Sequence, residues 1–469
     1  MTLSPARVPG TGARRLTATL YGYSFLDDFV LLYPVYALLF SDTGLPLWQI
    51  SSLFALWSVT GVLLEVPSGA WADAFSRRLL LCLGPLLTAA GFALWVLVPS
   101  YGAFAAGFVL WGAGGALGSG ALEALVHEEL DRLGAAGRYA RVMGRARAAG
   151  QIGVMGAMAL GGSLFALGGY PAVGAASVAA CLLAAATATR FPEHRTPAAD
   201  DAGQDTDDGD DGWTVTLRAG LAEVRRDRRV RGALLLVPAV AAVWGALDEY
   251  TPLLVRDTGV ADGTVPPLLL VIWAGVTVGS LLAGPAGRLG DKGLAALLAG
   301  AALALAVGAV TGTACAVILV ALAFGTFQLA NVLADARLQE RVGDARRATV
   351  TSLAGLGTDL ATVAVYLPYA AVAAATSHGT AFVWGAVPYL VTALILAATA
   401  GRPRAGGART GRPGAGAPRA GGPPVGKPRP GPAPEEVREE VREEVPEGVP
   451  EAVPGESRNE SPPTPAPTQ

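Results

Sequence analysis

Cysteine and histidine are scarce in this sequence, and neither forms a recognisable cluster. The three cysteines, Cys82, Cys181 and Cys315, all lie in apolar stretches with no spacing typical of a disulfide framework or a metal site. The three histidines are equally dispersed, so we expect no metal site, no cofactor and no enzyme active site. No Gly-Lys-Ser/Thr phosphate-binding loop occurs, which argues against direct use of ATP.

Long apolar runs fill the chain up to about residue 400. They are apolar on every side, without the 3.6-residue alternation of a soluble amphipathic helix. A bilayer core about 30 Å thick needs roughly 20 such residues per helix. The sequence therefore predicts an all-α membrane protein with twelve transmembrane helices. The predicted spans are 16–40, 48–71, 79–98, 101–125, 146–168, 170–190, 232–255, 265–287, 293–311, 313–336, 348–374 and 379–400.

Basic residues between these runs alternate from one side to the other. Connections on one side, with the adjoining ends of the spans, hold 24 Lys and Arg residues, whereas the other side has Arg256 alone. The positive-inside rule places the basic side, and with it both termini, in the cytoplasm. We expect a multi-pass protein of the cell membrane, with the lipid bilayer as its partner, no nucleic acid, and a monomeric state.

The chain divides by composition into five parts. The longest connection is acidic and then basic, which predicts a flexible linker followed by a surface amphipathic helix. The end of the chain is rich in Pro, Gly, Arg and Glu and is expected to be disordered. The parts are a cytoplasmic N-terminus at 1–15, a six-helix bundle at 16–190, the linker at 191–231, a second six-helix bundle at 232–400 and the tail at 401–469.

The two bundles repeat each other in sequence. Leu-Asp-Asp-Phe at 26–29 matches Leu-Asp-Glu-Tyr at 247–250, and Asp-Thr-Gly at 42–44 matches Asp-Thr-Gly at 257–259. Offsets of similar size relate three further pairs. These are Gly69 with Gly287, Asp73 with Asp291, and Glu123 with Asp335. Two parallel repeats related by an axis along the membrane normal are the plan of one large transporter class.

A short motif follows the second predicted span. It reads Gly69-Ala-Trp-Ala-Asp73-Ala-Phe-Ser-Arg77-Arg78. It resembles the Gly-x-x-x-Asp-x-x-x-Arg-Arg/Lys signature of the major facilitator superfamily, in the loop where that family carries it. The resemblance covers about residues 16–400 and implies that fold. The second half retains only Gly287 and Asp291 of the motif.

This resemblance implies a conformational latch at the cytoplasmic surface. Asp73 would meet the N-terminal end of span eleven, where the helix dipole favours a carboxylate. Arg77 would pair with Glu123 and stabilise the outward-facing state. The alternative is that these charges only fix the topology.

Acidic residues inside the predicted spans are the candidate functional groups. A charge at mid-membrane costs about 2.5–3.5 kcal/mol on insertion scales, so such residues usually face a cavity. Two neighbouring carboxylates ionise less readily together than singly, which suits a proton carrier or a cation site. The alternative is a structural role in hydrogen bonds between helices. The candidates are Asp27, Asp28, Glu65, Asp248, Glu249 and Asp359.

Tryptophans accompany these acids. Trp244 lies one turn before Asp248, and Trp57 and Trp273 occupy similar places in spans two and eight. Aromatic rings beside carboxylates are typical of sites for amphipathic or cationic organic substrates, although such tryptophans also serve in packing.

The leading interpretation is a secondary transporter that exports a small organic compound in exchange for protons. Uptake of a metabolite, a non-transporting sensor or scaffold, and a membrane enzyme are the alternatives. Two features of drug/proton antiporters are absent, namely an Arg in span four and a Gly-Pro pair in span five, where Ala157-Met158 stands instead.

Topology gives the first prediction. Impermeant labelling of single cysteines placed beside Arg77 and within 132–147 should mark both from the cytoplasmic side. Labelling of the two from opposite sides would contradict the predicted topology.

Overall fold

The computed structural model describes residues 11–192, 228–342 and 347–400, and the described residues form helices and short turns without any strand. The predicted linker helix and the C-terminal tail lie outside the described residues. The first bundle contains α1 (Thr11–Asp27), α2 (Tyr36–Asp42), α3 (Leu47–Ala74), α4 (Arg77–Leu97), α5 (Tyr101–Arg132), η1 (Ala136–Arg138) and α6 (Tyr139–Ala188). The second contains α8 (Arg228–Asp248), α9 (Thr251–Arg256), η2 (Asp262–Thr264), α10 (Val265–Ala286), α11 (Asp291–Thr311), η3 (Ala314–Ala316), α12 (Val317–Arg341), α13 (Arg347–Ala375) and α14 (His378–Ala400).

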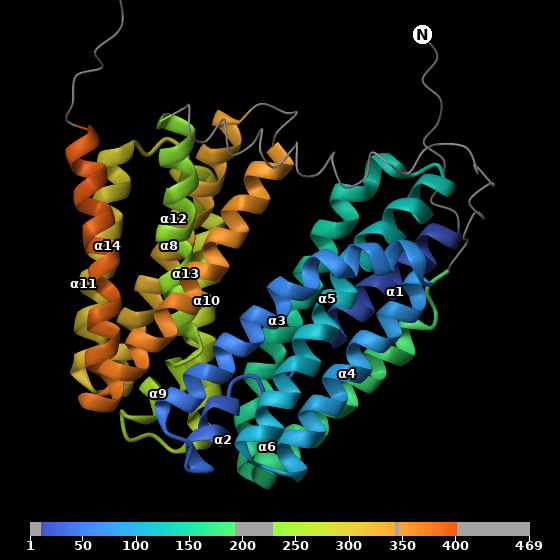
Figure 1. Cartoon of the computed structure of the whole chain (residues 1–469), viewed down its shortest axis with the longest axis horizontal. Coiled ribbons are helices and arrows are strands. Elements are labelled where there is room, and N and C mark those ends of the chain that lie inside the picture. The colour runs from blue at the N-terminus through green and yellow to red at the C-terminus, as the bar shows by residue number, and fades with distance from the viewer. Residues whose placement is uncertain (1–10, 193–227, 343–346, 401–469) are drawn as a thin grey trace, which may run out of the picture. The chain divides into compact units, whose positions relative to one another are not determined.

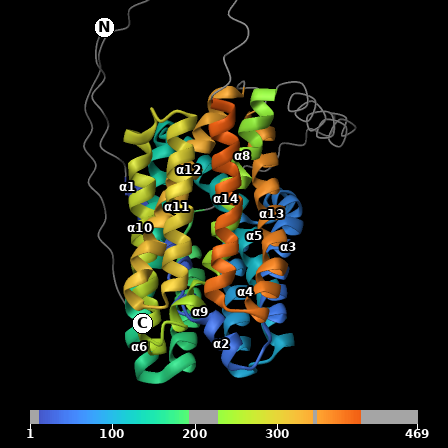
Figure 2. The same ribbon diagram turned by 90° about the vertical axis from the view of Figure 1, so that its left-hand side faces the viewer.

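Each bundle packs mainly within itself (Figure 1). In the first, α4 packs on α5 and α1 on α6; in the second, α10 packs on α12 and α11 on α14, which lie side by side in Figure 2. Between the bundles, α3 packs on α13 and α6 on α10. We call the end that carries α2 and α9 the outer end, because the basic connections are expected at the other.

Glycine allows the closest helix contacts. A Cβ atom added to Gly84 of α4 would lie 2.7 Å from the carbonyl oxygen of Gly114 in α5. In the second bundle a Cβ on Gly279 of α10 would meet the backbone of Gly325 in α12. Small residues at such crossings let helices associate in lipid, where no hydrophobic force drives them together.

The internal repeat is confirmed in the backbone. The matching Asp-Thr-Gly segments end α2 and α9, and both turn through a left-handed glycine, with φ of 85° at Gly44 and 82° at Gly259. In each, the glycine N–H donates to the carbonyl oxygen three residues earlier, in Ser41 and Arg256 respectively. A left-handed C-cap explains why glycine stands at both positions.

Ten described helices are long and apolar enough to cross a membrane. The long element α6 covers the fifth and sixth predicted spans and consists of two helices joined at a kink, Gly168–Gly169. The first predicted span is divided between α1 and α2. The count of twelve spans and the cytoplasmic termini remain predictions.

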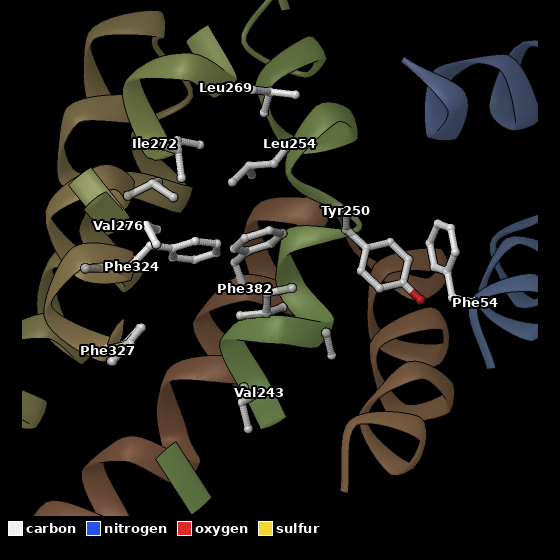
Figure 3. Packing of buried hydrophobic residues seen from close by; sticks show 14 of the residues in the cluster. Phe54, Val243, Tyr250, Leu254, Leu269, Ile272, Val276, Phe324, Phe327 and Phe382 are labelled. Atoms are coloured by element: carbon white, nitrogen blue, oxygen red, sulfur yellow. The ribbon is translucent and has the colours of Figure 1, made fainter. Parts of the chain in front are cut away.

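Leucines cover the outside of the bundles. Leu63, Leu97, Leu281 and Leu394 are 67–78% exposed, which would be costly in water but is natural against lipid tails. Inside, aromatic side chains fill the core, and Figure 3 shows Phe54 of α3 facing the ring of Tyr250 across the two bundles. The apolar exterior and the packed interior together describe a multi-pass membrane protein.

Candidate functional site

The helices of spans one and seven are both interrupted, and the paired acids mark the interruptions. Helix α1 ends at Asp27, and α2 begins only at Tyr36; α8 ends at Asp248, and α9 begins at Thr251. The prediction of continuous spans at 16–40 and 232–255 was therefore wrong. Apolar length alone does not reveal a break, because the residues inside it remain largely apolar.

Side chains from other helices satisfy the backbone near these breaks, as lipid cannot. The hydroxyl of Ser177 accepts a 2.9 Å hydrogen bond from the Leu32 N–H in the first break. In α8 the hydroxyl of Tyr389 accepts from the Trp244 N–H at 2.7 Å and donates to the Val240 carbonyl at 3.1 Å. The Tyr389 hydroxyl thus stands between the Trp244 N–H and the Val240 carbonyl, which a regular helix would join directly. This insertion opens α8 one turn before its end.

A cavity of about 460 Å³, the main cavity, lies beside the first break. Asp27 and Asp28 both line it and expose their side chains to it. Among the described residues, no side chain or backbone N–H donates a hydrogen bond to either carboxylate. The lining is otherwise aromatic, aliphatic, small or hydroxyl-bearing: Tyr23, Val30, Tyr33, Gly84, Thr88, Trp111, Gly114, Gly115, Gly118, Ser119, Leu122, Val154 and Trp273.

A second cavity continues from the first toward the basic end. This inner cavity has a volume of about 520 Å³ and shares Asp27 and Asp28 with the main cavity. Glu65 also lines it, and Glu123 and Arg147, paired at 3.2 Å, stand at its far side. The carboxylates at the first break thus lie between the centre of the protein and the basic end.

Helix α6 approaches α1 closely beside Asp28. A Cβ on Gly150 would lie 2.1 Å from Asp28 Oδ2, and one on Gly153 would lie 2.4 Å from the Phe25 carbonyl oxygen. Glycine at these positions therefore leaves room for the carboxylate and for the α1 backbone.

The acids at the second break are placed differently. Asp248 accepts a 3.1 Å hydrogen bond from the Tyr33 hydroxyl of the first bundle. Glu249 is buried, and its Oε2 has no hydrogen-bond partner in the described structure. Neither residue lines the main or the inner cavity. The two pairs that match in sequence therefore meet different surroundings, one open and one enclosed.

The tryptophans also separate into two groups. Trp273 of α10 lines the main cavity from the second bundle. Trp57 instead packs on Trp111 with ring centroids 5.3 Å apart, within a large aromatic cluster. The indole Nε1 of Trp244 is buried without a hydrogen-bond partner among the described residues.

The two remaining acids come from different bundles. Glu65 lies in α3 and Asp359 in α13, and these two helices pack on each other. Glu65 faces the inner cavity, whereas Asp359 lines neither cavity.

The outer end is closed by a polar contact that we call the outer gate. Arg256 of α9 pairs with Asp42 at 2.5 Å and donates to the Ser41 hydroxyl at 2.6 Å, both in α2. Tyr170 donates to the other Asp42 oxygen at 2.5 Å. Ser51 and Tyr250 add a 2.6 Å contact nearby. These contacts join α2 and α3 of the first bundle to the second bundle at the outer end.

Comparison with known proteins agrees with this geometry. The model of the Major Facilitator Superfamily matches residues 17–366. The chain belongs to the major facilitator superfamily. It is therefore a secondary transporter of the cell membrane with a small-molecule substrate. A comparison with curated protein sequences gives no match.

Solved superfamily structures share the fold at low sequence identity. The nucleoside transporter NupG is 15% identical, with a TM-score of 0.63 over 83% of this chain and 100% of NupG. A bacterial homologue of the human lysosomal transporter Spinster, inward-facing and unoccupied, is 16% identical, with a TM-score of 0.62 over 85% and 96%. The POT family transporter PepTSo is 14% identical, with a TM-score of 0.61 over 84% and 98%.

The signature motif of the superfamily falls at the end of α3 and the start of α4. Gly69 and Asp73 lie in α3, among residues 66–74 whose side chains are outside the described structure. Arg77 pairs with Glu128 at 2.5 Å, and Glu123 pairs with Arg147. With the outer end closed, Arg77 therefore does not pair with Glu123 as predicted for the latch, because Glu128, five positions further along α5, faces a different side of that helix. Arg78 is exposed.

The second half keeps part of this arrangement. Asp291 of α11 pairs at 3.1 Å with Arg337 of α12, which also donates to the Leu289 carbonyl. Gly287 follows α10 directly, and Asp335 is exposed on α12. An ion pair thus ties spans three and four in one half and spans nine and ten in the other, with the charges exchanged.

Sequence reasoning missed Tyr33, Trp111, Tyr170 and Tyr389. A lone tyrosine in an apolar run has no distinguishing pattern, so only the packed structure assigns it a partner. Asp42 and Arg256 could have been singled out from the sequence. Arg256 is the one basic residue in the connections predicted on the outer side, and Asp42 falls in the repeated Asp-Thr-Gly segment.

Small substitutions in α6 test the contact with α1. Gly153→Ala should lower the melting temperature of the purified protein, with a cost of about 1–3 kcal/mol for overpacking against backbone. Gly150→Ala should cost less, because the Asp28 side chain can rotate away. Gly144→Ala, where nothing lies within 4 Å, is the matched control. Equal stability of all three variants would contradict the close approach.

Proposed function

We propose that this transporter exports a small organic compound in exchange for protons, with Asp27 and Asp28 as the proton and substrate site. The observation that carries the proposal is the pair of carboxylates at a helix break, without a hydrogen-bond donor among the described residues, in a cavity that continues toward the cytoplasmic side. A carboxylate enclosed in the membrane is stabilised by binding either a proton or a cationic or hydrogen-bond-donating group.

Exchange follows from competition for one site. When substrate occupies the carboxylates, the proton must leave, and when a proton returns from outside, the substrate is displaced. The proton and the substrate then shift the equilibrium between the inward-facing and outward-facing states. Each does so only as far as it binds one state more tightly than the other. We propose that Glu65, at the inner cavity, and Asp359, on the opposite bundle, change the electrostatic potential along the path of the proton and the substrate.

The acids of the second break are proposed to act in the change of conformation. Asp248 holds Tyr33 of the first bundle while the outer gate is closed, and opening would break that bond and hydrate Glu249. The cytoplasmic motif, with Asp73 as its central residue, is proposed to act when the opposite end closes. In the structure described here, the outer gate holds the outer end closed.

The solved relatives transport different cargo, so their titles do not indicate the substrate here. Uptake would use the same cavity, and a sensor or scaffold would use the fold without flux. Proteoliposomes with and without an imposed pH gradient separate these functions: the proposal requires flux of at least one organic solute that follows the gradient.

Neutral substitution of the carboxylates tests the coupling site. Asp27→Asn and Asp28→Asn preserve size but cannot exchange a proton, so at least one should reduce gradient-driven transport by about tenfold or more. Uncoupled exchange of solute should fall less. Asp262→Asn, which removes a carboxylate outside both cavities, is the control. Full coupled transport by both single variants and the double variant would refute the role.

Disruption of the outer gate tests alternating access. Arg256→Ala should make a cysteine in the α2 segment more accessible from outside, with a shift of roughly 1 kcal/mol, or about fivefold in population, for a partly exposed ion pair. The exchanged pair Asp42→Arg with Arg256→Asp should restore part of the closure. Unchanged accessibility in Arg256→Ala would show that the gate does not hold this state.

A further inference from the structure

The charged side chains that line the main cavity are all acidic. Its lining contains two carboxylates, from Asp27 and Asp28, and no Lys, Arg or His side chain. Arg147 lies further along the inner cavity, where Glu123 already pairs with it at 3.2 Å. No described cation therefore balances the two acids at the first break, and an anionic ligand would meet unopposed negative charge.

Aromatic rings stand on the same walls. Trp111 of the first bundle and Trp273 of the second both line the main cavity, together with Tyr23 and Tyr33. Trp111 is held by rings on several sides, including Trp57 and a stacked Phe108 at 6.0 Å. A cation near the face of an aromatic ring is attracted by about 0.5–2 kcal/mol, depending on desolvation.

The size and the polarity of the cavity narrow the choice further. A volume of about 460 Å³ lies within the range of sites for small organic ligands. An inorganic ion would need a compact shell of oxygen ligands, and no group of three or more potential metal-ligating residues occurs in the described part of the chain. The mixed lining instead matches a molecule with one charged nitrogen and an apolar or aromatic body.

We propose that the transported substrate is a monovalent organic cation, with its ammonium group at Asp27 and Asp28 and its apolar body between Trp111 and Trp273. This inference rests on the proposed function for transport, but binding of the cation does not depend on proton coupling or on direction. Because Trp273 belongs to the second bundle, the bound cation contacts both halves and can favour one conformation over the other.

The test uses three benzyl alcohols that differ only in the para substituent. The substituents are trimethylammonium, which is permanently cationic, tert-butyl, its neutral carbon isostere, and sulfonate, which is anionic. Calorimetric titration of the full-length protein in detergent should show the cation binding at least tenfold more tightly than the isostere. The sulfonate should not bind. Equal binding of the cation and the isostere, or tighter binding of the sulfonate, would overturn the assignment.

Two kinds of variant locate the site. Asp27→Asn combined with Asp28→Asn should abolish the preference for the cation while binding of the isostere is retained, which shows that the protein is folded. Asp262→Asn should leave the preference unchanged. Trp273→Leu should weaken binding of the cation more than binding of the isostere. A preference that survives the double asparagine variant would place the cation elsewhere and refute the proposal.

Flux distinguishes this inference from the proposed function. If the cation binds as described but no solute moves in proteoliposomes, the transport proposal fails and the cation site remains. If only neutral or anionic solutes move with the pH gradient, the transport proposal remains and the organic-cation assignment fails.

Discussion

A polar group inside a membrane must find its partner within the protein, and this constraint governs the centre of the molecule. An unbroken helix satisfies its backbone internally and can face lipid with leucine, as the exposed leucines of these bundles do. The first and seventh predicted spans depart from this rule by breaking at paired acids. Both breaks are tolerated because they face protein or a cavity rather than lipid, and Ser177 and Tyr389 supply nearby hydrogen bonds that lipid cannot.

The two breaks share an origin in the internal repeat but have diverged in their surroundings. The first opens into a cavity, so its carboxylates can exchange ligands. The second is covered by residues of both bundles, and Asp248 is bonded to Tyr33 across the interface. A repeated motif has thus produced one pair of acids beside a cavity and one pair enclosed near the interface of the bundles. The outer gate, built from the repeat-related helices α2 and α9, lies directly beyond both.

The sequence predicted the fold well because the membrane imposes a strong and simple pattern. Apolar length and the repeat were each sufficient to indicate the helical, two-bundle architecture. The acids could be located but not distinguished, since Asp28 and Glu249 have similar sequence context and opposite exposure. The breaks and the tyrosine contacts were not predicted. They depend on which side chain of a distant helix reaches the backbone, and sequence periodicity holds no information about that.

The partner of Arg77 shows the same limit on a smaller scale. A charged residue near a helix end has several candidates within one or two turns, and the packing angle between α4 and α5 selects Glu128 rather than Glu123. Family resemblance indicated the helix that pairs with Arg77 here but named another residue of it. The resemblance was reliable for the fold and for the loop that carries the motif, which depend on topology rather than on a single rotamer.

The central claim is that the carboxylates at the first break take up and release a proton, and infrared difference spectroscopy observes this directly. Spectra of the protein in bilayers at alkaline and mildly acidic pH should differ by the C=O stretch of a protonated carboxylic acid. That band should disappear in the variant that carries both Asp27→Asn and Asp28→Asn. A band that persists unchanged in this variant, or a wild-type protein without any titrating carboxylic acid, would contradict the account.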